Sequence, residues 1–114
     1  MPFDGSDTAP SLHMLSDILR DESRWPPGFV WDYSYCGRCA MGLAARLWLG
    51  YQTGLIDAPA VAARAMADAF HMPVKAAYAI FTNLKFPNYE SVSPGDVADA
   101  IDAYLAHGCA AVIR

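Results

Sequence analysis

The chain has 114 residues, a length that suits one domain and leaves no room for two domains of ordinary size. Apolar residues make up 54% of it and charged residues 18%, which favours a packed globule over a disordered chain. The formal net charge of -4 argues against a broad basic surface, so we expect no nucleic-acid partner and no anionic membrane.

Residues 1–10 contain Asp4 and Asp7 and no apolar run, so we expect a flexible tail without a secretory signal. Residues 11–114 are expected to form a single helical domain, and no stretch approaches the length of a membrane span. The three cysteines are expected to stay thiols, because cytosolic disulfides are uncommon and an odd number cannot pair within one monomer. These features together predict a cytoplasmic protein.

The first helical pattern begins after Ser11, which can cap it, and continues to about residue 22. Residues 23–35 then contain two adjacent prolines and a glycine, which predict a loop, and their aromatic content predicts packing against the domain. A second helix is predicted from Ser34 or Cys36 to Gly50 or Gly54. It is apolar on nearly all sides, so we expect it at the centre of the fold.

A third helix is predicted to begin at Asp57 and to run to about residue 71. Its predicted inward face consists of Val61, Ala65, Met66, Ala69 and Phe70. Pro73 suits the first turn of a fourth helix. The predicted inward face of this helix consists of Val74, Ala77, Tyr78, Phe81 and Leu84.

The predicted fifth helix has a strong start signal. Ser93 supplies a capping hydroxyl, Pro94 suits the first helical position, and Asp96 faces the positive end of the helix dipole. Gly108 is expected to end it. Its predicted inward residues are Val97, Ile101, Tyr104 and Leu105. The fold class that follows is all-α: a single compact bundle of about five short helices with a central apolar helix.

Cys36 and Cys39 lie three residues apart in the sequence CGRC, at the predicted start of the second helix. The positive end of a helix and the neighbouring Arg38 favour a thiolate there, so the pair is a candidate redox dithiol. A thioredoxin-like fold is not expected, because the flanking segments are helical in period and lack a βαβ pattern.

Zinc is a second reading of the same cysteine pair. It requires further ligands from His107 and Cys109, or from His13 or His71. The third reading is that Cys39 belongs to the packed interior of the helix, as free cysteines often do. We expect no cofactor, and zinc is the one metal that the spacing leaves open.

A cluster of aromatic residues precedes the cysteines. Its members, the candidate partner-binding residues, are Trp25, Phe29, Trp31, Tyr33 and Tyr35. Rigid aromatic side chains are common at binding surfaces, and they are equally common in lids over small cores. Both interpretations stay open at this point.

The segment RAMADAFHMPVKAAYAIF has the spacing of a helix-turn-helix, which gives a DNA-binding reading. Between Pro73 and Leu84, however, the only charged residue is Lys75, whereas a recognition helix offers polar or basic side chains to DNA.

No catalytic constellation is visible in the sequence. The three histidines lie on or at the ends of separate predicted helices, without a carboxylate or nucleophile partner. The acids Asp96, Asp99 and Asp102 recur every three residues and are expected to form a solvated helix face.

The order of "CAMGLAARLW", "MPVKAAYAIF" and "SPGDVADAIDAYL" after an aromatic lead-in resembles small all-helical proteins of unknown function from bacteria and their phages. The resemblance implies a helical fold and identifies no catalytic residue. Our leading hypothesis is a cytosolic interaction or regulatory protein, of phage or mobile-element origin, that binds a protein partner or a second copy of itself. A dithiol or zinc protein is the second hypothesis and a helix-turn-helix DNA binder the third.

Overall fold

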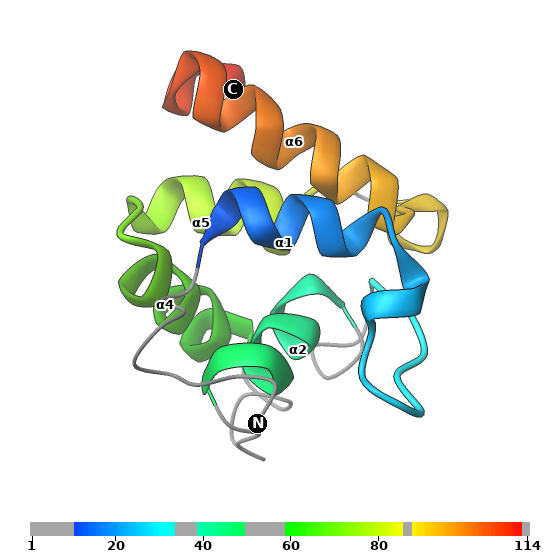
Figure 1. Cartoon of the computed structure of the whole chain (residues 1–114). Coiled ribbons are helices and arrows are strands. Elements are labelled where there is room, and N and C mark those ends of the chain that lie inside the picture. Colours follow the sequence, from blue (N-terminus) through cyan, green and yellow to red (C-terminus); the bar gives the residue numbers. More distant parts are fainter. Residues whose placement is uncertain (1–10, 34–38, 50–58, 86–87, 113–114) are drawn as a thin grey trace.

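The computed structural model describes residues 11–33, 39–49, 59–85 and 88–112. Within these ranges it contains five α-helices and no strand, which confirms the predicted all-α class (Figure 1). The helices are α1 (Leu12–Leu19), α2 (Ala40–Ala44), α4 (Pro59–Phe70), α5 (Val74–Phe81) and α6 (Pro94–His107). No helix in the described ranges is long and apolar enough to cross a membrane. Several predicted features lie outside them, namely the tail and Ser34, Tyr35, Cys36, Arg38, Gly50, Gly54 and Asp57.

Helix α1 starts as predicted, because the Ser11 side chain accepts the backbone N–H of Met14 at 3.4 Å. Its leucine and isoleucine face is buried. The helix ends at Leu19, earlier than residue 22, because Asp21 is extended and its carboxylate accepts the N–H of Ser23 at 3.1 Å. Asp21 thereby caps a separate 3₁₀ turn, Glu22–Arg24, and stops the first helix from continuing.

Helix α2 begins after Cys39, later than the predicted start near Ser34 or Cys36. Cys39 has extended dihedral angles (φ -97°, ψ -170°), so it is the N-cap and not part of the first turn. All five residues of α2 are buried, in agreement with the predicted apolar central helix. A π-helix, Ala45–Leu49, continues α2 to the end of this described range.

Helices α4 and α5 pack against each other, but part of the predicted inward face of α4 is wrong. Met66 and Phe70 are buried as expected, whereas Val61 is 55% exposed. Three alanines are buried in addition: Ala62, Ala63 and Ala67. An alanine-rich helix has several nearly equivalent apolar faces, so periodicity alone cannot choose between them. In α5 the buried residues are Ala76, Ala77, Ile80 and Phe81, while Val74 and Tyr78 are half-buried.

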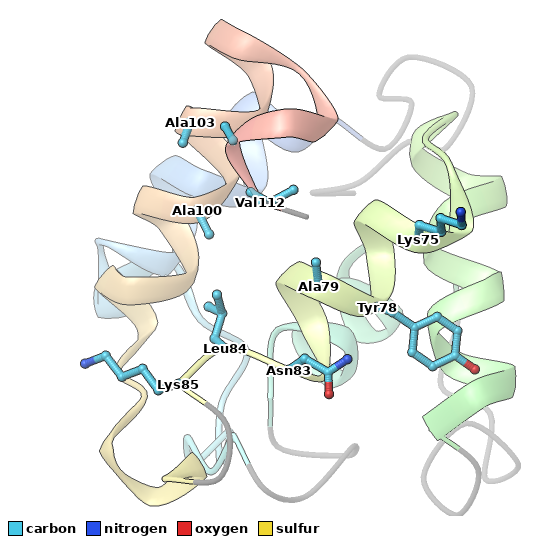
Figure 2. Close-up of a pocket in the computed structure, with 10 residues that line it drawn as sticks. Lys75, Tyr78, Ala79, Asn83, Leu84, Lys85, Ala100, Ala103 and Val112 are labelled. Atoms are coloured by element: carbon cyan, nitrogen blue, oxygen red, sulfur yellow. The ribbon is translucent and has the colours of Figure 1, made fainter. Parts of the chain in front are cut away.

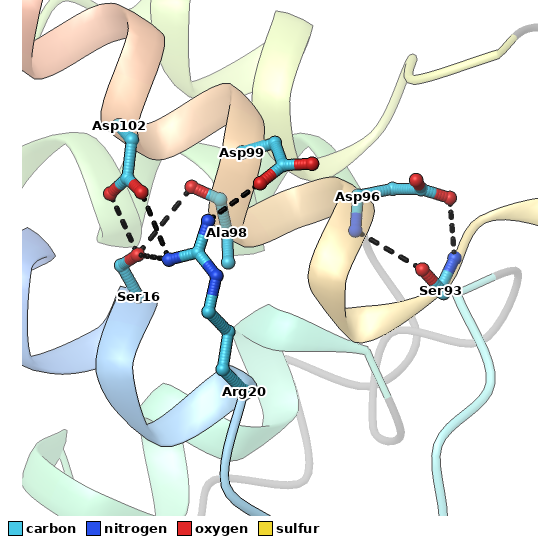
Figure 3. Close-up of polar contacts among 7 residues, drawn as sticks. All are labelled: Ser16, Arg20, Ser93, Asp96, Ala98, Asp99 and Asp102. Atoms are coloured by element: carbon cyan, nitrogen blue, oxygen red, sulfur yellow. Dashed lines mark hydrogen bonds and ion pairs between the residues drawn. The ribbon is translucent and has the colours of Figure 1, made fainter.

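Helix α6 has the predicted capping box. The hydroxyl of Ser93 accepts the Asp96 N–H at 3.1 Å, and the Asp96 carboxylate accepts the Ser93 N–H at 2.9 Å (Figure 3). The helix ends at Gly108, as predicted, and this residue has a positive φ of 80°, which glycine adopts readily.

The predicted inward face of α6 is correct for Val97 and Ile101 and wrong for Leu105, which is 37% exposed. Helix α6 has 14 residues and its neighbour α1 has 8. The longer helix extends beyond its partner, so its last turns have less of the bundle to cover them.

In the bundle, α6 lies alongside α1, and α5 packs on α4 (Figure 1). The core runs through all five helices and includes Val92 and Tyr33 from the connecting segments. The contact of α6 with α5 is slighter than its contact with α1. This leaves an opening between α5 and α6, where the candidate site lies.

Candidate functional site

A groove of about 860 Å³ lies between α5 and α6 (Figure 2). Its walls carry small side chains, Ala79 from α5 and Ala100 and Ala103 from α6. Val112, which follows the 3₁₀ turn Cys109–Ala111, lies at the end of the groove near Ala103. The volume is within the range of ligand-binding clefts, and its apolar walls are typical of them.

Polar side chains lie at the edge of the groove, where Lys75 and Lys85 are the charged members of its lining. None of the described residues that line it is acidic. Lys85 Nζ lies 2.9 Å from the carboxylate of Asp96, just outside the lining. The pKa of Asp96 is held below its usual value, first by the hydrogen bond from the Ser93 N–H and then by Lys85. The local charge is therefore positive although the whole chain carries -4.

This groove was not predictable from the sequence. Its lining residues come from two helices and the turns after them, and the chain between α5 and α6 separates Ala79 from Ala100. The one sequence signal was the alanine content of α5 and α6, which predicts that neighbouring backbones can approach closely.

Three of the candidate partner-binding aromatics use their polar atoms inside the protein. Trp25 Nε1 donates to the carbonyl of Ile18 at 2.8 Å, and Trp31 Nε1 donates to the carbonyl of Val92 at 2.8 Å. The indole rings are half-buried and pack against the core. Their hydrogen bonds attach the loop to the end of α1 and to the segment before α6.

Tyr33 is buried and joins the same loop to the end of α5. Its hydroxyl donates to the Ile80 carbonyl at 2.9 Å and accepts the Leu84 N–H at 3.0 Å. Burial raises the pKa of this phenol well above its ordinary value, so it stays protonated. Its ring lies 6.0 Å from that of Tyr89, a neighbour that the sequence analysis did not anticipate.

The outer part of the loop is more exposed. Phe29 is half-buried, forms an edge contact with Trp25 at 5.4 Å between ring centroids, and lies 5.2 Å from the guanidinium carbon of Arg46. Val30 is 61% exposed. On its inner side the loop is therefore hydrogen-bonded to the rest of the protein, and on its outer side it exposes Val30. Partner binding through its aromatic residues stays a prediction.

Cys39 is fully buried, and its sulfur accepts the Met41 N–H at 3.3 Å. This placement agrees with the packing interpretation of that residue. Cys109 is half-buried in the last 3₁₀ turn. The described ranges contain no group of three or more histidine, cysteine or acidic side chains arranged to hold a metal. Because Cys36 lies outside the described residues, a joint role for the CGRC pair stays a prediction.

All three acids on α6 are engaged within the fold, contrary to the expectation of a merely solvated face: Asp96 pairs with Lys85, and the other two pair with Arg20. Arg20 Nη2 lies 2.6 Å from the Asp99 carboxylate, and Arg20 Nη1 lies 2.9 Å from that of Asp102 (Figure 3). Ser16 is buried between the helices, donates to Asp102 at 2.7 Å and accepts from Arg20 at 2.6 Å. We call Ser16, Arg20, Asp99 and Asp102 the α1–α6 clamp.

The electrostatics of the α1–α6 clamp favour the charged forms of Arg20 and Asp102. Hydrogen bonding from Ser16, together with Arg20, lowers the pKa of Asp102, and the contact with Asp99 raises that of Arg20. The side-chain hydrogen bonds of Ser16 and Arg20 connect them to each other, to the two acids and to the Ala98 carbonyl on α6. The clamp therefore acts as a connection between two helices, and its groups are not arranged for acid–base chemistry.

Helices α4 and α5 are joined by three residues, as the helix-turn-helix spacing predicted. His71 in this turn has a positive φ of 55°. All three histidines, His13, His71 and His107, are exposed. The exposed part of α5 offers one cation, Lys75, to a DNA backbone. DNA binding stays a prediction that no further feature of the described residues supports.

Comparisons with protein-family models, with curated proteins and with solved structures give no match to this chain. The resemblance to helical bacterial and phage proteins therefore stays a prediction.

Proposed function

We propose that this chain is a cytoplasmic protein-binding domain without enzymatic activity, and that a helical segment of a partner protein occupies the groove between α5 and α6. The groove is the observation that carries this proposal. It is about 860 Å³ in volume, and Figure 2 shows apolar side chains between the two helices while Lys75, Tyr78 and Lys85 point outward at its edge. This arrangement of an apolar centre and a polar rim is typical of protein interfaces.

The small side chains of the groove favour a helix as its occupant. The side chains of Ala79, Ala100 and Ala103 are short, so the backbone of an added helix can approach α5 and α6 closely. Docking of an amphipathic helix into an apolar groove is a recurring mode of peptide recognition. A small-molecule site has polar groups that converge on the ligand, whereas the polar groups here lie at the rim.

The aromatic loop is the alternative surface for a protein partner. The indole N–H groups of Trp25 and Trp31 are already bonded to backbone carbonyls, and Tyr33 makes two such bonds. A partner would have to replace these bonds to engage the polar atoms of the loop. The groove requires no such exchange, so we place the docking surface there.

The test is a selection of helical peptides displayed on phage, each about four helical turns long, on the purified full chain. Ala103→Trp fills the groove with a large side chain, and Val30→Ala, on the aromatic loop, is the matched control. We expect peptides that bind the wild type and the control and that fail on Ala103→Trp. Binders that are insensitive to Ala103→Trp and sensitive to Val30→Ala would assign the docking surface to the aromatic loop instead.

A further inference from the structure

The two lysines at the edge of the groove differ in their surroundings. Lys85 Nζ is 2.9 Å from the Asp96 carboxylate and 3.5 Å from the Ser91 carbonyl, so its charge is partly neutralised within the fold. Lys75 is exposed and has no ion pair or hydrogen bond to any described residue. The groove therefore has one cation engaged by the fold and one that is not.

The position of Lys75 does not stabilise its own helix. It is the second residue of α5, and Pro73 at the N-cap offers no capping side chain. The positive end of a helix dipole disfavours a cation in the first turn. A carboxylate placed beside Lys75 would face both this cation and the positive end of α5, which makes this end of the groove electrostatically complementary to an acid.

Lys75 and Lys85 lie at opposite ends of the groove, one at the start of α5 and the other just past its end (Figure 2). The two lysines are ten positions apart in the chain, a separation that corresponds to a rise on the order of 15 Å along a helix. A partner helix that follows α5 would therefore carry its acids about two to three turns apart. Its central turns would contact the alanines.

We infer that the groove selects an acidic amphipathic helix, with a carboxylate at the Lys75 end as the main determinant. This inference rests on the proposed function and adds the chemistry of the partner to it. Three observations carry it: the absence of acids among the described lining residues, the ion pair that engages Lys85, and the unpaired cation at the start of α5. The whole chain carries a net charge of -4, which makes this local preference for acids distinctive.

The experiment uses the phage library described above with its polar positions divided among glutamate, lysine and glutamine. Peptides that bind the full chain and fail on Ala103→Trp are sequenced, and their affinities are measured by fluorescence anisotropy. We expect glutamate to be enriched, chiefly toward one end of the helix. Lys75→Glu should weaken these peptides about tenfold, and Lys75→Gln by a smaller factor. Arg64→Gln, an exposed cation on α4 outside the groove, is the matched control and should change little.

The outcomes separate the two proposals. Groove-dependent peptides that are neutral or basic, or that bind Lys75→Glu as tightly as wild type, would overturn the acidic preference and leave the binding role intact. The absence of any groove-dependent peptide would overturn both. A labelled DNA duplex that binds wild type and not Lys75→Glu would replace the peptide with nucleic acid. Self-association that Ala103→Trp abolishes would identify a second copy as the occupant.

Discussion

The two sides of α6 have opposite character. The side toward α1 is closed: Ala98 and Ile101 are fully buried, and the α1–α6 clamp joins the two helices through charge-assisted hydrogen bonds. The side toward α5 is open, and Ala100 and Ala103 line the groove there. One helix thus supplies both a structural contact and one wall of the groove.

This difference indicates how a small domain can divide stability from binding. Stability depends on apolar area removed from water and on satisfied buried polar groups, and both are concentrated on the α1 side of α6. The contact of α6 with α5 is slighter than its contact with α1. The alanines on the α5 side can therefore serve recognition at small cost to the fold.

The largest predicted effect tests the closed side. Ile101→Ala should lower the free energy of unfolding by about 2 to 5 kcal/mol, because it removes fully buried methyl groups and leaves a cavity. Ala103→Ser, on the open side of the same helix, should change it by about 0.5 kcal/mol or less. Urea unfolding followed by circular dichroism measures both. Equal losses would contradict the division between the two sides.

The next effect tests the α1–α6 clamp. Ser16→Ala removes the hydroxyl that bridges Arg20 and Asp102, and it should cost about 1 to 2 kcal/mol after the better helix propensity of alanine is included. The direct ion pairs of Arg20 remain, which limits the loss. The double-mutant cycle with Asp102→Asn should show coupling between the two positions. Additive effects would mean that the Ser16 hydroxyl contributes nothing through Asp102.

A smaller effect compares the groove with the aromatic loop. Trp31→Phe keeps an aromatic ring but leaves the Val92 carbonyl without its indole donor, so it should cost about 1 kcal/mol of stability. Binding of the groove-dependent peptides should be unchanged. Loss of peptide binding with unchanged stability would place the docking surface on the loop.

The smallest predicted effect is the pH dependence of the α1–α6 clamp. The pKa of Asp102 is lower in the folded chain than in the unfolded chain, so its contribution to stability is present above about pH 4. That contribution is lost as the pH falls through the folded-state pKa. Since the Asp102 side chain is 49% exposed, water screens the effect and it should be modest.

Urea unfolding of wild type and Asp102→Asn between pH 3 and pH 7 measures this dependence. The variant should show a flatter decline of stability toward acid than the wild type. Asp68→Asn, on the exposed surface of α4, is the matched control. A pH profile of Asp102→Asn that runs parallel to that of the wild type would mean that Asp102 does not contribute to the pH dependence of stability.

Local features were predictable where their partners lie close in the chain. The Ser93 and Asp96 capping box spans four residues, and Ser11 caps α1 through a contact three residues away. The start of α2 was placed too early, because nothing in the local pattern showed that Cys39 would be extended and act as the cap. Cysteine is not a preferred capping residue, so propensity gave no warning.

The inward faces were less predictable in the alanine-rich helices. Val61 was assigned to the core of α4 and is 55% exposed, while neighbouring alanines are buried. Alanine occurs on buried and exposed faces alike, so the hydrophobic periodicity of an alanine-rich helix does not show which face is buried. Asp99 and Asp102 on α6 were predicted to form a solvated face, although both pair with Arg20. That residue lies about eighty residues earlier in the chain, so the local sequence gives no sign of the contact.

The sequence by itself therefore determined the all-α class, the helical cap at Ser93, the glycine end of α6 and the buried character of α2, since these depend on local hydrogen bonding and composition. The tertiary structure alone decided the α1–α6 clamp, the bonded interior of the aromatic loop and the groove between α5 and α6. Each of these joins residues far apart in the chain, and their proximity follows from how whole helices pack against one another.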